Sequence, residues 1–295
     1  MSGLESRSQN VDLHCHGGAG YYFSDPNPDN VKTAIEFHKS HGTSTLVASL
    51  VTEEIPVLKE QIQRLLPFSQ DKSIAGIHLE GPYLAQARCG AHEPSLLKAP
   101  KLDEIKSLLD TGQGHISMIT IAPELEGAIE AISYLRSQGV IAAIGHSAGN
   151  YDDAIRAIDA GAQLVTHFSN GMSKLADGDK TFATALLFES DILLELILDG
   201  HHVSDNDVHT IFSHAGDRVV FVTDAMAAAG QPDGEYRIGN LDVNVKDGVA
   251  RLKKNGSLAG STLTMDLAIT NARALGLSDE IIYESSSKNA RDLLG

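Results

Sequence analysis

The sequence predicts an α/β fold, a (β/α)8 or TIM barrel, from two patterns that run along most of its 295 residues. Eight short runs of mainly aliphatic and β-branched residues alternate with longer segments whose apolar residues recur at helical spacing. Strands that are apolar on both faces and alternate with helices are typical of a parallel sheet. Eight such units predict a barrel whose active site lies at the carboxyl ends of the strands.

The predicted elements follow one another in a regular order. Strands are expected at residues 11–16, 43–50, 73–79, 116–122, 140–145, 163–166, 192–198 and 218–223. Helices between them are expected at about residues 29–41, 53–66, 102–111, 124–138, 151–160, 181–189 and 205–215. In the fourth of these helices, Ile129, Ile132 and Leu135 show the spacing of one buried face.

The pattern changes after the eighth predicted strand. Residues 236–252 alternate between apolar and polar side chains and contain Asp247-Gly248, a dipeptide that favours tight hairpin turns. They predict a small β-hairpin insertion, which a polar, glycine-containing loop over residues 253–261 follows. Two further helices, at residues 264–275 and 279–294, are expected to close the barrel.

Composition limits the classes of partner. The net charge of −16 argues against nucleic acid and anionic membrane surfaces. The two cysteines, Cys15 and Cys89, lack CxxC spacing, which is typical of a protein in the reducing cytoplasm, and no apolar run is long enough to cross a bilayer. We therefore expect a cytoplasmic protein with one domain at residues 11–295, after a flexible polar segment over residues 1–10.

The first predicted strand ends in a candidate metal-binding pair. Its sequence runs into His14-Cys15-His16, followed by Gly17-Gly18, where the chain is expected to turn. Strand alternation places His14 and His16 on one face and Cys15 on the other, toward the barrel wall. Two adjacent imidazoles can chelate one ion, although His-x-His alone is a weak signal.

Acidic and histidine side chains also follow other predicted strands. Glu80, His146 and His167 come at the ends of the third, fifth and sixth strands, and Asp224 ends the eighth. Because strand ends converge in a barrel, the first three predict a three-ligand metal site with one coordination position open. The pair from the first strand permits a second ion with Glu80 bridging, and Asp224 is placed to contact a metal or its water.

Each of these residues also has an ordinary structural interpretation. His146 alone is explained equally well by a hydrogen-bonded core position, Glu80 by a turn cap, and Asp224 by a helix cap. His201-His202 is explained equally well as an exposed loop pair. The functional interpretation rests on their common position at strand ends. No role is assigned to the remaining histidines, which are His38, His41, His78, His115, His209 and His214.

Six longer motifs follow the strands in a fixed order. They are HLEGPYL at 78–84, GHSAGNYDDA at 145–154, THFSNGMSKL at 166–175, DGHHVS at 199–204, VTDAMAAAG at 222–230 and LAGSTLTM at 258–265. Together they resemble the N-acetylglucosamine-6-phosphate deacetylase family of the amidohydrolase superfamily, and the similarity covers residues 11–295. The resemblance implies metal-dependent hydrolysis of the acetamide of N-acetyl-D-glucosamine 6-phosphate to D-glucosamine 6-phosphate and acetate.

The resemblance also implies a metal centre. It makes Glu80, His146 and His167 metal ligands, and it matches His14 and His16 to a pair that some members use for a second metal. The ligand types favour Zn²⁺, as one or two ions per subunit, although Fe²⁺, Mn²⁺ or Co²⁺ also fit them.

Catalytic and substrate-binding roles follow from the same resemblance. Asp224 matches the acid–base that takes a proton from water and returns it to the leaving amine. His92 matches a histidine that contacts the substrate near the scissile amide and stabilises the oxyanion. Further substrate-binding residues are implied on three loops: Asn170, Gly171, His202, Leu258, Ala259, Gly260, Ser261 and Thr262.

Other functions stay open on the sequence alone. Within the same class, N-acetylgalactosamine 6-phosphate or another N-acyl amino sugar is the alternative substrate. A non-catalytic sugar-phosphate-binding relative is a second class, but it would not need Asp224. A dihydroorotase-like cyclic amidase would leave the DGHHVS and LAGSTLTM segments unexplained.

The sequence departs from the family pattern in two places. It offers no segments for the accessory β-sandwich that the family usually carries before and after the barrel. The loop over residues 173–180 lacks the arginine that the family typically donates to a neighbouring subunit, and Lys174 or Lys180 would replace it only as point charges. A solvated loop is the simpler interpretation of both lysines, so the phosphate requirement and a homodimer stay open.

Overall fold

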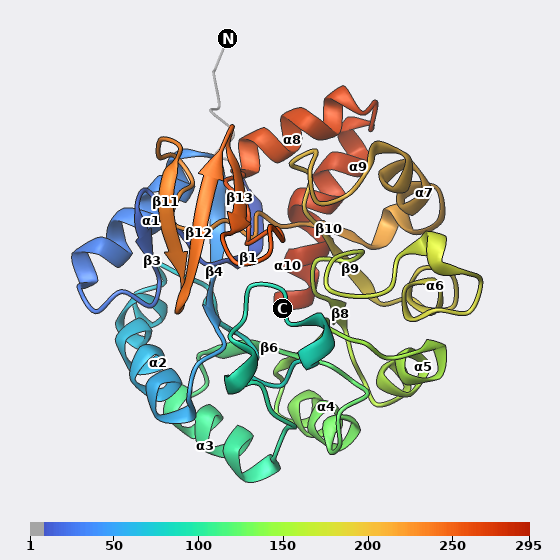
Figure 1. The fold of residues 1–295 in the computed structure, drawn as a ribbon, viewed down its shortest axis with the longest axis horizontal. Coiled ribbons are helices and arrows are strands. Elements are labelled where there is room, and N and C mark those ends of the chain that lie inside the picture. Colours follow the sequence, from blue (N-terminus) through green and yellow to red (C-terminus); the bar gives the residue numbers. More distant parts are fainter. Residues whose placement is uncertain (1–8) are drawn as a thin grey trace.

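The computed structural model describes residues 9–295 and contains one eight-stranded parallel sheet ringed by helices (Figure 1). The strand order β1-β4-β5-β6-β7-β8-β9-β10 follows the sequence, as in a (β/α)8 barrel. The strands are β1 (Asn10–Cys15), β4 (Thr43–Val51), β5 (Gly76–Glu80), β6 (Ile116–Ile121), β7 (Ile141–Ile144), β8 (Leu164–Val165), β9 (Leu193–Leu196) and β10 (Val219–Phe221). All eight predicted strands are confirmed.

The barrel is nearly closed between its first and last strands. Cys15 and Ala225 form an isolated parallel bridge, and the Asp224 backbone N–H donates to the His14 carbonyl over 2.8 Å. The closing contact therefore lies at the carboxyl ends of β1 and β10, beside the predicted site residues.

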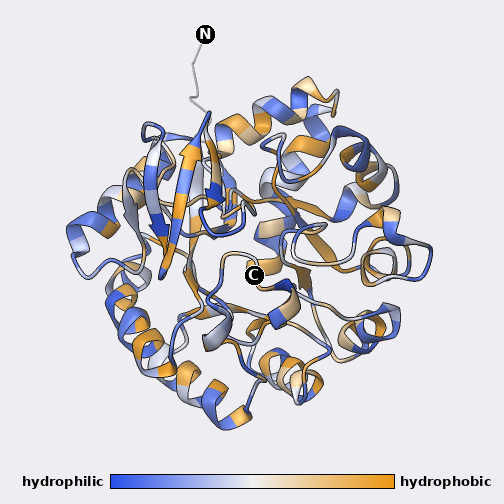
Figure 2. Ribbon diagram, in the orientation of Figure 1, coloured by the Kyte–Doolittle hydropathy of each residue, from blue (hydrophilic) through white to orange (hydrophobic). Residues whose placement is uncertain are grey.

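Helices cover the outside of the sheet. They are α1 (Pro28–Ser40), α2 (Ile55–Gln70), α3 (Leu102–Gly112), α4 (Ala128–Ser137), α5 (Tyr151–Asp159), α6 (Phe182–Phe188), α7 (Asp205–Ala215) and α8 (Met265–Ala274). Most of them bury one apolar face, as α4 does with Ala131, Ile132 and Leu135, and expose a hydrophilic one (Figure 2), whereas α6 is buried over nearly its whole length. No helix in the described part of the chain has both the length and the hydrophobicity to span a bilayer.

The last predicted helix is divided into three parts. It consists of α9 (Asp279–Tyr283), a π-helical turn at Glu284–Lys288 and α10 (Asn289–Leu294). Ser287 Oγ and Arg291 Nη2 beside this turn donate to the Gln9 carbonyl over 2.9 and 2.8 Å. The segment expected to be flexible covers residues 1–10, of which residues 1–8 lie outside the described residues. Gln9 is hydrogen-bonded and leads directly into β1. A single domain over residues 11–295 stays a prediction.

The expected hairpin insertion is wrong in its number of strands. The structure has a three-stranded antiparallel sheet of β11 (Gly234–Ile238), β12 (Leu241–Lys246) and β13 (Val249–Leu252). Asp247-Gly248 makes the predicted turn, with φ of 53° and 75°. A second turn forms at Gly239, with φ of 51°, and returns the chain from β11 to β12. One apolar face of this sheet packs beside the barrel mouth.

The chain near the first strand also turns later than predicted. Gly17–Gly18 forms β2, which pairs with β3 at Tyr21–Tyr22, so the turn falls at Ala19 and Gly20. A Cβ atom on Gly17 would lie 2.2 Å from the Tyr21 carbonyl oxygen, so this close pairing needs glycine. Cys15 points into the wall as expected, with Sγ 3.2 Å from His38 Nε2 on α1.

Candidate active site

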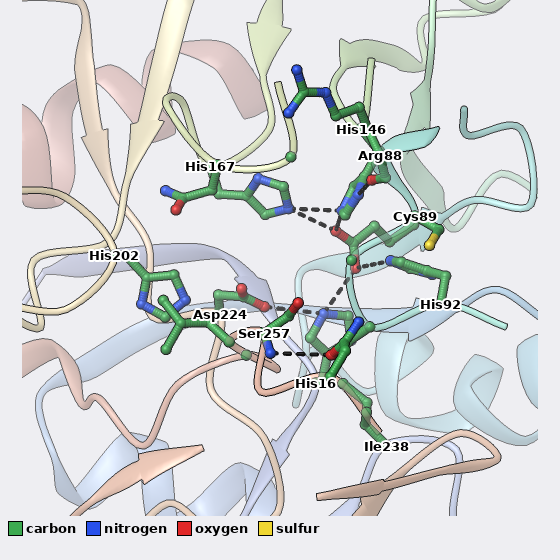
Figure 3. A pocket seen from close by; sticks show the side chains of 18 of the residues that line it. His16, Arg88, Cys89, His92, His146, His167, His202, Asp224, Ile238 and Ser257 are labelled. Atoms are coloured by element: carbon green, nitrogen blue, oxygen red, sulfur yellow. Dashed lines mark hydrogen bonds and ion pairs between the residues drawn. The ribbon is translucent and has the colours of Figure 1, made fainter. Parts of the chain in front are cut away.

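Glu80, His146 and His167 meet at the barrel mouth, as their positions after the strands predict. Figure 3 shows the two histidines directed toward each other. Glu80 Oε1 lies 3.1 Å from His146 Nε2 and 3.0 Å from His167 Nε2, and the two imidazole nitrogens are 3.0 Å apart. All three residues are at least 95% buried. Three ligand atoms at these mutual distances form a triangle that one metal ion can cap.

Strand ends carry unusual backbone geometry at three of these positions. His146, His167 and Asp224 have φ of 46°, 29° and 47°, although none is glycine. A positive φ costs free energy for an L-residue and is concentrated at functional sites. The strain turns each side chain from the end of its strand into the mouth of the barrel.

The histidine pair of the first strand faces the other oxygen of Glu80. His14 Nε2 and His16 Nε2 are 3.1 Å apart and lie 3.6 and 3.1 Å from Glu80 Oε2. Asp224 Oδ1 completes this group at 3.5 and 3.2 Å from the same two nitrogens. Glu80 therefore presents one oxygen to each of two neighbouring donor groups, the arrangement expected of a bridging ligand.

The ring of His146 is fixed by the loop that follows β5. Its Nδ1 donates to the Arg88 carbonyl over 2.7 Å, which leaves the Nε2 lone pair directed at Glu80. Gly90 and Gly171 approach the same ring so closely that an added Cβ would lie 3.0 Å from Cε1 and 3.1 Å from Nδ1, respectively. Both glycines also have positive φ, so two loops close around His146 where larger residues would clash.

His92 is oriented as a hydrogen-bond donor toward the cavity. Its Nδ1 lies 3.4 Å from the Thr52 backbone N–H, which donates to it, and 2.9 Å from Thr52 Oγ1. The ring proton is therefore on Nε2, 3.4 Å from Glu80 Oε2. Burial lowers the pKa of His92 to about 4, so the ring is neutral at pH 7 and donates through Nε2.

Charges are concentrated in this buried cluster. Burial opposes ionisation of Glu80 and Asp224, but the nearby histidines, His14 foremost, hold the pKa of both carboxyls below their usual range. Burial also opposes charge on His14, whereas Glu80, Glu195 and Asp224 raise its pKa well above the usual value. The cluster thus holds its carboxylates ionised only by pairing them with positive charge.

The donor set fits divalent metal ions. His14, His16 and Asp224 form one group whose ligand atoms lie within 4.8 Å of one another, and Glu80, His92 and His146 form another. His167 is closer to Glu80 and His146 than His92 is, so the second group is better described with His167 as the ligand. Imidazole and carboxylate donors with charge to neutralise are the ligands of Zn²⁺ and similar ions.

A cavity of about 400 Å³ opens above these donors. Five predicted substrate-binding residues besides His92 line it, namely Asn170, Gly171, His202, Leu258 and Gly260. His202 Nδ1 donates to Asp199 over 2.7 Å, and this contact lowers the pKa of Asp199 despite its burial. The cavity is thus enclosed by loops that follow different strands.

Three predicted substrate-binding residues do not line this cavity. Ala259 packs with the small sheet, and Ser261 is buried, with Oγ donating to the Thr223 carbonyl over 2.5 Å. Thr262 donates to the Gly248 carbonyl over 2.6 Å. The chain bends at Gly260, whose φ is 64°, and of the five predicted residues of this segment only Leu258 and Gly260 reach the cavity.

Several lining residues were not predicted. They are Ala87, Arg88, Cys89, Gly90, Ala91, Ile238, Asn255 and Ser257. Residues 87–91 lie in the sequence between the HLEGPYL segment and His92, and this position was the sequence feature that could have predicted them as cavity-lining residues. Ile238 ends β11, which the predicted hairpin did not separate from β12, so its position at the cavity depended on the fold of the small sheet.

The fold and the site define the chain as a barrel of the amidohydrolase class. It is similar to the N-acetylgalactosamine-6-phosphate deacetylase of Escherichia coli O157:H7, with 36% identity over 96% of this chain and 76% of that protein. It is also similar to the N-acetylglucosamine-6-phosphate deacetylase of Vibrio furnissii, with 32% identity over 97% of this chain and 72% of that protein. No protein-family model matches the chain.

Solved structures give the same relationship. The N-acetyl-D-glucosamine-6-phosphate deacetylase of Mycobacterium smegmatis, in complex with N-acetyl-D-glucosamine-6-phosphate, superposes with a TM-score of 0.94 and 40% identity. The alignment covers 98% of this chain and 77% of that one. The chain belongs to the family of N-acetylglucosamine- and N-acetylgalactosamine-6-phosphate deacetylases.

Proposed function

We propose that the protein hydrolyses the acetamide of N-acetyl-D-glucosamine 6-phosphate to D-glucosamine 6-phosphate and acetate. The observation that carries the proposal is the convergence of Glu80, His146, His167 and Asp224 beneath one cavity at the mouth of the barrel. A sequence relative at 32% identity and a solved structure at 40% identity are both named N-acetylglucosamine-6-phosphate deacetylases. The assay is release of acetate from this substrate.

The chain supplies proton transfer and carbonyl recognition. Glu80, His146 and His167 would hold a divalent ion, which would supply Lewis-acid chemistry by lowering the pKa of water toward ~7 and polarising a carbonyl. Asp224 accepts the proton of the attacking water and delivers it to the amide nitrogen, because an amine leaves only when protonated. The neutral His92 donates its Nε2 proton in a hydrogen bond to the carbonyl oxygen as negative charge develops there.

Metal removal should abolish activity in a reversible way. We favour Zn²⁺, with one ion at Glu80, His146 and His167 and a second at His14 and His16, and Fe²⁺, Mn²⁺ or Co²⁺ as substitutes. Dialysis against a chelator is expected to reduce acetate release at least about 100-fold, because without the ion water loses its activation near pH 7. Readdition of metal should restore the rate, with metal content measured in the same samples. Full activity in metal-free protein would contradict the proposal.

The phosphate needs a positive charge that the 173–180 loop does not place at the cavity. Neither Lys174 nor Lys180 lines the cavity, and Lys180 Nζ instead lies 5.9 Å from the centre of the Tyr151 ring. Arg88 is the one lysine or arginine among the described residues that line it. Its side chain extends past His146, on the side of the cavity away from His16 and Asp224 (Figure 3). We propose that Arg88 binds the 6-phosphate with Asn170 and Gly171.

Arg88→Ala should separate phosphate recognition from chemistry. The Arg88 carbonyl that fixes His146 belongs to the backbone and is retained. We expect kcat/KM for the 6-phosphate to fall about 10- to 100-fold, the range for loss of a charge-assisted hydrogen bond, with no change for unphosphorylated N-acetylglucosamine. Lys180→Ala is the control and should change neither value. Equal kcat/KM for both substrates in the unmodified protein would reject a phosphate requirement.

N-acetylgalactosamine 6-phosphate is a second candidate substrate. The relative from Escherichia coli O157:H7 that shares 36% identity carries the galactosamine name. The two sugars differ only in the configuration at one hydroxyl, so the chemistry at the amide is the same for both. Measuring kcat/KM for both 6-phosphates on one preparation distinguishes the epimers.

We also propose a cytoplasmic location and a homodimer. Cys15 and Cys89 are free thiols, which suits a reducing compartment. A dimer would allow loops of one subunit to approach the cavity of another. Sedimentation of the purified protein measures the oligomeric state.

A further inference from the structure

Glu195 is a buried acidic residue that the proposed reaction does not use. It lies on β9 inside the barrel, with 0% of its surface exposed. An ionised carboxylate at this depth is costly unless donors or positive charges surround it. Its Oε1 atom has no hydrogen-bond partner among the described residues, so the hydrogen bonds of Glu195 are made through Oε2.

Both contacts of Oε2 are to predicted metal ligands. His14 Nδ1 and the His167 backbone N–H each lie 3.0 Å from this oxygen. His14 belongs to the donor group of the second ion, and His167 belongs to that of the first. One buried carboxylate therefore contacts both halves of the metal centre without facing the cavity.

The contact with His14 fixes which ring nitrogen faces the donor cluster. A carboxylate accepts hydrogen bonds, so His14 Nδ1 carries a proton and Nε2 is the nitrogen left to bind a metal ion. Nε2 is the atom that lies 3.1 Å from His16 Nε2 and 3.5 Å from Asp224 Oδ1. Metal-bound histidines commonly donate their other N–H to a carboxylate, which orients the ring and increases its basicity.

His16 and His167 lack such an anchor. The Nδ1 atoms of both rings have no hydrogen-bond partner among the described residues. Within the second donor group, His14 is therefore the imidazole whose orientation a carboxylate holds.

We propose that Glu195 is a positioning residue that enables the second divalent ion to bind, by holding the His14 ring with Nε2 toward His16 and Asp224. This inference rests on the proposed metal centre, not on the identity of the sugar.

Cobalt(II) titration of the metal-free protein, followed by visible absorption and metal analysis, tests the proposal. The unmodified protein should bind two ions. Glu195→Gln should leave the affinity for the first ion unchanged and weaken the second about 10- to 100-fold, the effect typical of a residue that supports a ligand. Glu124→Gln is the matched control, because Glu124 bonds Ser147 and Ala148 but contacts no predicted ligand. Unchanged affinity for both ions in Glu195→Gln would overturn the proposal.

A second measurement does not require a variant to fold. Imidazole ¹⁵N NMR of the zinc-loaded unmodified protein should show His14 protonated at Nδ1 and metal-bound at Nε2. Metal bound at Nδ1 would overturn the positioning role. Binding of a single ion by the unmodified protein would also overturn the positioning role. That outcome would not affect the hydrolase proposal, because acetate release and metal removal test that proposal separately.

Discussion

Asp224→Asn is expected to lower kcat for acetate release about 10²- to 10⁴-fold, the usual contribution of a general acid–base. The amide cannot accept the proton of the attacking water, and it cannot return one to the amine. Asp224 lies 3.2 Å from His16 Nε2 and lines the cavity, so it is positioned for both transfers. Asparagine has nearly the same size, and the backbone bond from Asp224 N–H to His14 should persist. Kinetics with metal-saturated protein measure the effect.

The control for this variant is another buried aspartate outside the site. Asp153 accepts from the Asn150 backbone N–H at the start of α5, and Asp153→Asn should leave kcat unchanged. Metal content should remain at the level of the first ion in Asp224→Asn, because Glu80, His146 and His167 are untouched. Near-normal turnover in Asp224→Asn would exclude the proposed proton transfers.

Glu80→Gln is expected to remove both metal ions at once. Glu80 presents Oε1 to His146 and His167 and Oε2 to His14 and His16, so the neutral amide weakens both groups. A ligand replacement should exceed the roughly 10- to 100-fold loss of affinity seen when only a supporting residue is changed. Acetate release should fall below detection, and metal analysis after gel filtration should find less than one-tenth of the normal content.

The matched control is again Glu124→Gln, which changes a glutamate beside the His146 loop and should keep both metal and activity. Circular dichroism should show the same secondary structure in both variants. If Glu80→Gln retained one tightly bound ion and lost only the other, Glu80 would be a ligand of one group and not a bridge between two.

The sequence predicted the barrel because the relevant information is local. Strand and helix periods repeat along the chain, and each run of buried residues reports which face packs against its neighbours. The same reasoning failed for the small sheet, where Gly239 makes a turn that the alternating pattern does not mark. The resemblance named Ala259, Ser261 and Thr262 together with Leu258 and Gly260, and the sequence does not reveal which of them reach the cavity.

The order of residues along the chain is enough to place these side chains at the barrel mouth, since parallel strands all end at the same edge. Their orientation depends on the folded chain, because His14, His146 and His92 each present a defined nitrogen while a distant partner holds the other one. The bond from His14 to Glu195 joins residues 181 positions apart. Such a contact depends on barrel closure and side-chain geometry, and no periodic pattern along the chain encodes either.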